Sequence, residues 1–216
     1  MTENPPVTIR KFQKKDREDV RRICCSTGFL GSPVSNFLDG DEIFADCLTL
    51  YFTDYEPEAC FVAECQGKVV GYITGAKDLR QVYRNNILCR IFIKIIASAA
   101  LGKPKNRLFI WNLLMSLLKR EFSDPDFSKE YPATLHINIQ DGLRGSKIGA
   151  GLIDAYLGYL KGEGVRGVHF ATMSERASNF FSKQRFSLLY RGKRSYFSYI
   201  LHKGWLLYIY GKRLAE

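Results

Sequence analysis

The feature that most constrains the fold is a glycine-rich turn between a predicted strand and a predicted helix. Residues 133–140 read ATLHINIQ and alternate apolar with polar side chains, as a strand does. The turn LRGSKIGAGL (143–152) follows, and the chain up to about Lys161 is typical of a helix. GVHFATM (167–173) predicts another strand. Two strands joined by a crossing helix run in the same direction, so we expect a parallel pair here.

The turn is suited to holding an anion. Small residues let the backbone approach a ligand closely, and the start of a helix offers unpaired N–H groups at the positive end of its dipole. The sequence matches neither the Walker loop GxxxxGK[ST] nor the dinucleotide turn GxGxxG. Two interpretations therefore remain: a phosphate-binding loop, or glycines that serve only a tight turn and close helix packing.

The other elements are predicted from periodicity and turn residues. They are a strand at 7–12, a helix from Asp16 to Gly28, a helix from Asp41 to about Tyr51, a loop at 51–57, a hairpin of strands 59–64 and 69–76 turning at Gln66 and Gly67, a helix at 175–184, and two closing strands, RFSLLY (185–190) and SYFSYILH (195–202). Residues 79–122 break this pattern and predict two helices joined at Gly102 to Pro104.

The segment 135–186 resembles the coenzyme A-binding half of the GNAT superfamily of N-acetyltransferases. This superfamily carries [QR]xxGx[GA] after its fourth strand. Arg144 and Gly149 match the outer positions of that motif, whereas Lys147 stands where a glycine is expected. The order of strand, helices and hairpin before residue 79 is also similar to the first half of the family. The resemblance leaves out 79–122, which is interpreted as an insertion.

A second motif of the superfamily, NxxAxxFYxxxGF, is also similar to this chain. Ala177, Phe180 and Phe186 match it. Its Asn, Tyr and Gly positions are occupied by other residues, namely Ser174, Phe181 and Arg185. The tyrosine usually protonates the departing thiolate, and phenylalanine cannot do so. Water, Ser182 or one of the tyrosines (Tyr51, Tyr55 or Tyr72) could replace it, or the thiolate could leave without a dedicated acid.

The resemblance implies an α/β (α+β) fold, with a mixed and mostly antiparallel central sheet flanked by helices. It implies one GNAT-like domain over residues 1–216, with 79–122 as a helical insertion. Acetyl-CoA is the implied cosubstrate, with no metal, and the implied reaction moves an acetyl or other acyl group to a primary amine of a small molecule. The implied cofactor-binding residues are Ile137, Ile139, Arg144, Gly145, Ser146, Lys147, Ile148, Gly149, Ala150, Ser174, Phe181 and Lys183.

Candidate catalytic residues are harder to select. His136 suits a general base because its reference pKa of about 6.5 lies near neutral pH, although a histidine on a central strand can equally be structural. Asn138 lies two residues on and shares its strand face. Tyr51, Asp54 and Tyr55 are candidates for binding a cationic amine. The missing tyrosine and the lack of an obvious base leave an alternative function, an acyl-CoA-binding sensor or scaffold with little or no activity.

Charge is concentrated in two segments. Residues 77–122 carry ten basic and two acidic residues, and residues 183–213 carry eight basic residues and no acid. Two basic segments on an acidic body favour local sites for anions, and without a known binding motif nucleic acid is not expected. The apolar stretch Leu108 to Leu118 is expected to be covered by the core or by a second copy in a homodimer. A membrane surface and an acidic protein are the less favoured alternatives.

The compartment is predicted from the N-terminus and the cysteines. MTENPPVTIR lacks the basic head and apolar core of a signal peptide, which favours a cytoplasmic protein. The six cysteines show no CxxC spacing, so neither a disulfide framework nor a zinc site is expected.

Overall fold

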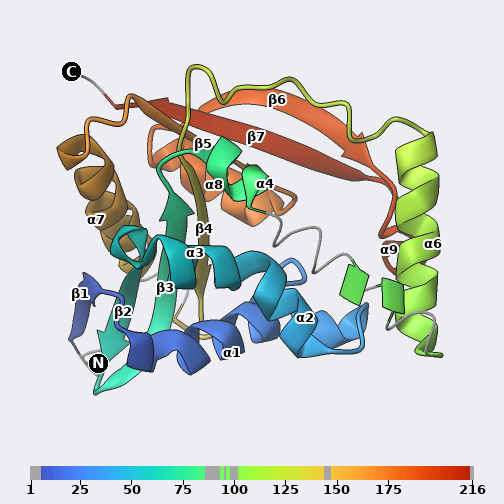
Figure 1. Ribbon diagram of the computed structural model, residues 1–216, viewed down its shortest axis with the longest axis horizontal. Helices are drawn as coiled ribbons and strands as arrows, with labels where there is room; N and C mark the ends of the chain where they lie inside the picture. The colour runs from blue at the N-terminus through green and yellow to red at the C-terminus, as the bar shows by residue number, and fades with distance from the viewer. Residues whose placement is uncertain (1–5, 86–92, 95, 98–101, 144–146, 215–216) are drawn as a thin grey trace.

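Two antiparallel sheets form the centre of the protein (Figure 1). The computed structural model describes residues 6–85, 93–94, 96–97, 102–143 and 147–214. The first sheet has the order β1-β2-β3-β4, with β1 Val7–Lys11, β2 Phe61–Cys65, β3 Lys68–Ala76 and β4 Thr134–Ile139. The second has the order β5-β7-β6, with β5 Gly167–Thr172, β6 Ser187–Arg194 and β7 Trp205–Arg213.

The two sheets meet at one parallel bridge. Ala133, which precedes β4, pairs with Val168 of β5 in the parallel sense. The backbone N–H of Ala133 donates to the Gly167 carbonyl at 3.1 Å, and that of His169 donates to the Ala133 carbonyl at 2.9 Å. Beyond this bridge β4 and β5 belong to different sheets. The expected parallel contact is therefore present, but only where the two strands begin, and their carboxyl ends are not paired with each other.

Helices cover the sheets and connect the strands. Their bounds are α1 Arg17–Thr27, α2 Asp41–Ala45, a π-helical turn Asp46–Leu50, α3 Tyr51–Tyr55, α4 Leu79–Arg84, α6 Pro104–Leu118, α7 Ile148–Gly162, α8 Glu175–Lys183 and α9 Ser198–Leu201, with 3-10 turns at Lys14–Asp16, Val34–Asn36 and Pro57–Ala59. The mixed α/β class with mostly antiparallel pairing is confirmed.

The first sheet separates two apolar clusters, which fixes the direction of each side chain on β4. Ile23 of α1 packs with Tyr72 of β3 on one face. Leu152 and Tyr156 of α7 pack with Leu135 of β4 on the other. In the register of β3 with β4, Tyr72 is opposite Asn138 and Thr74 is opposite His136. Because side chains alternate along a strand, His136 and Asn138 lie on the face of α1.

The hairpin was predicted at the right place. β2 and β3 turn at Gln66 and Gly67, whose φ angles are 50° and 75°. Positive φ at both central residues is the pattern of the turn whose twist matches two antiparallel strands, and it explains the glycine.

Two predicted elements were wrong. The predicted loop at 51–57 is helical as far as Tyr55, because the chain continues from α2 through the π-helical turn into α3. The closing segment SYFSYILH contains α9 instead of a strand. Its aromatic residues suit a strand by propensity, but Phe197 packs into a cluster with Phe29 and Phe37. The last strand is β7, which pairs with both β5 and β6.

The basic segment 79–122 contributes α4 and α6 to the described structure. Residues 86–92, 95 and 98–101, which fall within its first predicted helix, lie outside the described residues. The chain after α6 returns along the outside of the second sheet to β4 (Figure 1).

Candidate functional site

Three elements converge where the glycine-rich turn enters α7. A Cβ atom built on Gly149 would lie 3.0 Å from Cζ of Phe180 in α8 and 3.2 Å from Cδ1 of Ile139 at the end of β4. Both distances are tighter than ordinary van der Waals contact. Gly149 therefore lets the first turn of α7 approach the end of β4 and the side of α8, which is a packing role that the sequence left as one of two interpretations.

The start of α7 retains the features of an anion site. Lys147 occupies the N-cap position and its side chain makes no capping hydrogen bond. The first hydrogen bond along the helix runs from the N–H of Gly151 to the Lys147 carbonyl at 3.0 Å. The N–H groups of Ile148, Gly149 and Ala150 precede it, at the positive end of a helix of 15 residues. The predicted ligands Arg144, Gly145 and Ser146 lie outside the described residues.

The second motif of the sequence has a structural explanation in α8. The Ser174 hydroxyl accepts a hydrogen bond from the N–H of Ala177 at 3.2 Å and caps the helix. At the other end, the Arg185 N–H donates to the Ser182 carbonyl and the Phe186 N–H donates to the Phe181 carbonyl. These two bonds form a Schellman motif, in which Arg185 has the left-handed φ of 60° that usually requires glycine.

This geometry gives Phe181 and Ser174 roles other than the predicted one. Phe181 is 3% exposed and lies among Phe170, Phe186 and Tyr210. Its ring belongs to the core, and its predicted contact with a cosubstrate stays a prediction. Ser174 is occupied as the cap of α8. The motif thus specifies how α8 begins and ends.

The other predicted cofactor residues that the structure describes lie either on the exposed surface or on the α7 face of β4. Lys147 and Lys183 are exposed at the start of α7 and the end of α8. Ile137 and Ile139 are partly buried on the α7 face of β4. These positions are compatible with the predicted binding of an acyl-CoA.

A polar group of three side chains lies on the other face of β4. The Asn138 amide donates to the Tyr72 hydroxyl at 3.1 Å, and that hydroxyl lies 3.3 Å from Nδ1 of His136. Tyr72 is fully buried against α1, and burial raises its pKa well above the usual value. The sequence suggested His136 and Asn138 for catalysis and Tyr72 only as one possible proton donor to the thiolate. It did not predict that Tyr72 contacts Asn138, 66 residues away in the chain, because the two meet only across the sheet.

The environment makes His136 a weak base. Burial lowers the pKa of His136 to about 4, so the imidazole is neutral at pH 7. Since Asn138 already donates to the Tyr72 oxygen, the Tyr72 hydroxyl proton can donate to Nδ1, and His136 then carries its own proton on Nε2. In that arrangement His136 offers a hydrogen-bond donor at Nε2. Its low pKa makes it a poor acceptor of a proton from an amine.

The predicted amine-binding residues are largely occupied by internal contacts. Arg17 forms an ion pair with Asp54, so the carboxylate charge is already offset. The Tyr51 hydroxyl donates to Glu56 at 3.0 Å, and Tyr51 is buried. Tyr55 is 56% exposed and stacks on Tyr51 with ring centroids 5.6 Å apart. Of the three, only Tyr55 presents most of its side chain to solvent.

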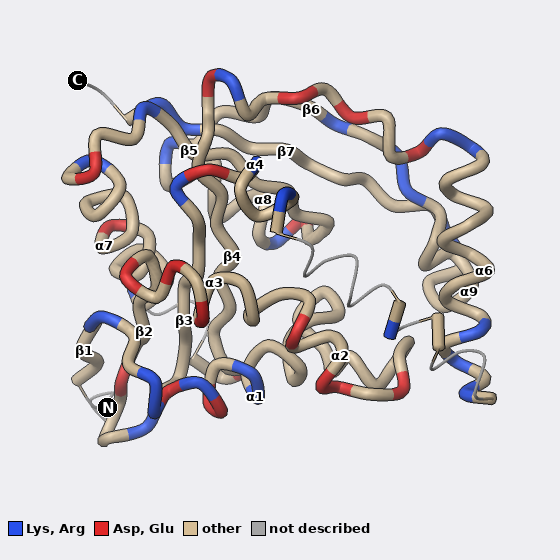
Figure 2. The backbone as a smooth tube through the Cα atoms, in the orientation of Figure 1, with Lys and Arg blue, Asp and Glu red and all other residues tan. Residues whose placement is uncertain are grey.

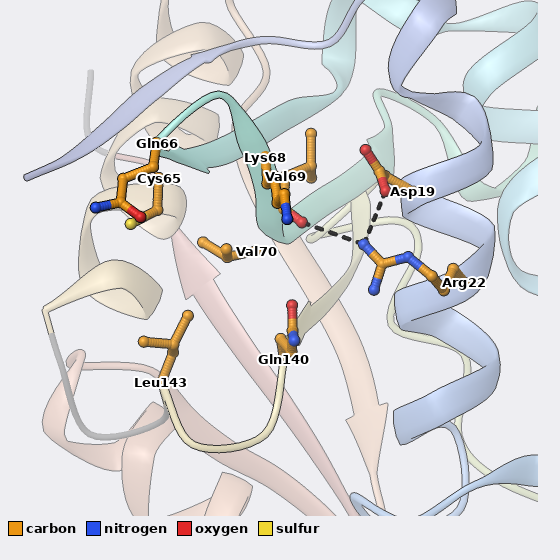
Figure 3. A pocket seen from close by; sticks show the side chains of 9 residues that line it. All are labelled: Asp19, Arg22, Cys65, Gln66, Lys68, Val69, Val70, Gln140 and Leu143. Carbon is orange, nitrogen blue, oxygen red and sulfur yellow. Dashed lines mark hydrogen bonds and ion pairs between the residues drawn. The ribbon is translucent and has the colours of Figure 1, made fainter. Parts of the chain in front are cut away.

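Two of the pockets formed by the described residues lie close to these elements. Figure 3 shows the larger, of about 570 Å³, at the end of the first sheet. Its lining includes Lys68 at the β2-β3 turn and Gln140 and Leu143 after β4. Arg22 of α1 also lines it, and its guanidinium donates to Asp19 at 2.7 Å. Sequence reasoning missed this pocket. Its volume is typical of small-ligand sites, and it adjoins the chain that leads into α7.

The smaller pocket, of about 480 Å³, lies where α1 begins beside α3. Arg17 and Asp54, already paired with each other, are among its lining residues. Neither pocket is lined by His136 or Asn138. We select the candidate site by the chemistry of its residues instead. It consists of the polar group on one face of β4 and the start of α7 on the other face.

Comparison with known proteins identifies the fold. No protein-family model matches this chain, and none of the curated proteins matches it. Solved structures do. SsHAT is 24% identical with a TM-score of 0.72, and the match covers 98% of this chain and 100% of that one. The polyamine N-acetyltransferase of Drosophila melanogaster, which forms N-acetylagmatine, is 14% identical with a TM-score of 0.63 over 97% and 100%.

A third structure is yncA from Salmonella typhimurium, solved with its cofactor acetyl-CoA. It is 12% identical with a TM-score of 0.57 over 97% of this chain and 95% of that one. Together these matches show that the chain has the fold of GNAT acetyltransferases over 97–98% of its length. The fold that the resemblance implied is therefore confirmed.

Proposed function

We propose that this protein transfers an acetyl group from acetyl-CoA to a primary amine of a small molecule. The observation that carries the proposal is the start of α7, where the N–H groups of the first helical turn and Lys147 stand beside a β4 strand that, within the described residues, is not paired with β5 beyond Ala133. The part of β4 that β5 does not cover can hydrogen-bond an extended chain, and the helix start can hold its phosphates.

Acetyl-CoA matches both halves of this site. Its pyrophosphate would lie at the N–H groups of Ile148, Gly149 and Ala150, with Lys147 adding a positive charge. Its pantetheine would run along β4 toward Ile139. Lys183, at the end of α8, is a further candidate for a phosphate contact. Arg144, Gly145 and Ser146 remain proposed ligands on the strength of the resemblance alone.

The amine would approach from the α1 face of β4. His136, Asn138 and Tyr72 are polar side chains there, and an Nε2 proton on His136 would hydrogen-bond an oxygen of the acceptor or of a water molecule. We assign His136 and Asn138 to positioning the acceptor. Tyr55, which is exposed, remains a candidate for an aromatic contact with it. Solved structures with this fold include enzymes that act on polyamines and agmatine, which supports an amine acceptor.

Collapse of the tetrahedral intermediate must expel a thiolate. With a reference thiol pKa of about 8.5, a thiolate is a tolerable leaving group and needs no dedicated acid. The Tyr210 hydroxyl is held by Ser178 at 2.7 Å and Ser182 at 3.1 Å, so it is occupied within the core. The burial of Phe181 and these contacts leave water as the proposed proton donor.

Calorimetry with acetyl-CoA tests the binding half of the proposal. Lys147→Glu places a negative charge at the start of α7 and should weaken binding about tenfold or more. Lys161→Glu changes the same charge at the other, exposed end of the same helix and should leave binding within about twofold. Equal effects of the two variants would show that the phosphates do not bind at the start of α7.

A thiol-release assay with a panel of amines tests the transfer half. We expect CoA release that depends on an amine such as agmatine or spermidine. Tight binding of acetyl-CoA without amine-dependent release would instead support the sensor or scaffold, the alternative drawn from the sequence. Comparing the rates of CoA release across the amines also ranks them as acceptors.

A further inference from the structure

The helix α6 exposes an apolar surface to solvent. Trp111 is 61% exposed and Leu118 is 75% exposed. Leu108 and Leu114 are also exposed, and at helical spacing of three and four residues these four side chains form one stripe. We call it the α6 stripe. Figure 1 shows α6 at the edge of the molecule with no other element on its outer side. The sequence predicted that the protein's own core or a second copy covers this face. In the single chain the core does not cover the α6 stripe, and cover by a second copy stays a prediction.

The opposite side of α6 is attached to the protein by polar contacts. Asn106, fully buried, accepts a hydrogen bond from the Asp39 N–H at 2.7 Å and donates to the Asp39 carbonyl at 2.9 Å. Ser116, fully buried near the other end, donates to Glu121 at 2.7 Å. Between them, Phe109 stacks on Phe197.

These contacts fix the rotation of the helix. To turn the α6 stripe inward, the helix would have to break the hydrogen bonds of two buried polar side chains, each costly to leave unpaired. The helix thus buries polar groups and presents apolar ones, the reverse of an ordinary surface helix. Exposed apolar surface of this extent in a monomer indicates a binding surface.

The charge around the stripe indicates its partner. From Lys103 to Arg120 the chain has five basic residues and no acid. Figure 2 shows basic residues at both ends of α6. Two copies of α6 packed against each other, parallel or antiparallel, would bring these positive ends together, which opposes a dimer through this helix. An anionic surface matches them.

We propose that α6 is a membrane-surface helix that docks the protein on anionic lipid. The α6 stripe would enter the boundary between headgroups and acyl chains, with Trp111 at the interface where indole rings are favoured, while the flanking lysines and arginines contact anionic headgroups. Within the described residues no helix is long and apolar enough to cross a bilayer. The proposed binding is peripheral, because it uses one exposed face of α6, and it is independent of acetyl transfer.

Flotation of the full chain with vesicles tests the proposal. We expect the protein to float with vesicles of phosphatidylcholine and about one-third phosphatidylglycerol at low salt, to float less at high salt, and to remain unbound with phosphatidylcholine alone. The paired substitution Trp111→Gln and Leu118→Gln should reduce the bound-to-free ratio about tenfold or more. Both side chains are exposed, so the fold should tolerate the change.

The control is Leu188→Gln, an exposed leucine on β6. It should bind as the unchanged protein does, and circular dichroism should show all three proteins equally folded. Failure to float on anionic vesicles would overturn the proposal, as would an equal loss in the Leu188→Gln variant. Sedimentation equilibrium adds a third decisive outcome: a dimer that the paired substitution dissociates would assign the α6 stripe to a second copy of the chain.

Discussion

Acid sensitivity of the fold should depend on His136. Burial lowers its pKa to about 4 in the folded protein, whereas in the unfolded chain the reference value is about 6.5. Between these values the unfolded chain binds more protons than the folded one. The contribution of neutral, buried His136 to the free energy of unfolding is therefore present above about pH 6.5 and is lost as the pH falls toward 4. For a shift of this size the linkage relation gives a loss of about 2 kcal/mol between pH 7 and pH 5.

The variant His136→Asn removes this titration while keeping a polar side chain. Urea unfolding at pH 7, 6 and 5 should show that the variant loses about 2 kcal/mol less than the unchanged protein over that range. Some acid sensitivity should remain in the variant, because burial also lowers the pKa of His169.

His202→Asn is the matched control. His202 is exposed, and its left-handed φ of 53° is one that asparagine tolerates. The control should follow the unchanged protein at every pH. Parallel stability curves for His136→Asn and the unchanged protein would refute the reasoning, because His136 would then titrate alike in the folded and unfolded chains.

Three further predictions concern the elements around the site. Gly158 lies on the exposed side of α7, where an added methyl group would have no atom within 4 Å, so Gly158→Ala should stabilise the fold by about 0.5–1 kcal/mol. Gly149→Ala should give no gain in stability and should weaken acetyl-CoA binding. Urea unfolding and calorimetry check the two variants, and equal gains in stability would contradict the close packing at Gly149. Tyr156→Phe removes a buried hydrogen bond to the Thr134 carbonyl at 2.6 Å and should cost about 1–2 kcal/mol in urea unfolding; an unchanged midpoint would show that the bond contributes nothing. Arg185→Val should lower stability by about 1 kcal/mol or more because a β-branched residue fits a φ of 60° poorly, while Arg185→Gly should not; thermal melting that ranks them the other way would exclude the left-handed cap.

Local sequence patterns were sufficient for the elements at the centre of the fold. The alternation in 133–140 and the glycines after it predicted β4, the turn and α7, since each signal is contained in a few neighbouring residues. The same holds for the hairpin at Gln66 and Gly67, where the turn needs two positive φ values. The fold as a whole came from the resemblance.

What the sequence could not predict depends on contacts between distant residues. Asp54 was selected as a free carboxylate, and its partner Arg17 is 37 residues away. His136 was selected as a base, and its weak basicity comes from burial near Tyr72, 64 residues away. Propensity also misassigned the segment around Phe197, where packing on Phe29 and Phe37 outweighs the β preference of aromatic residues.

The most direct test of the account is to follow both products of the proposed reaction by mass spectrometry, with purified protein, acetyl-CoA and a primary amine such as agmatine. The account predicts that N-acetylated amine and free CoA form in equal amounts, at a rate that rises with amine concentration and falls in Lys147→Glu but not in Lys161→Glu. CoA release that stays at the rate of spontaneous hydrolysis for every amine, although acetyl-CoA binds, would contradict acetyl transfer as the function of this protein.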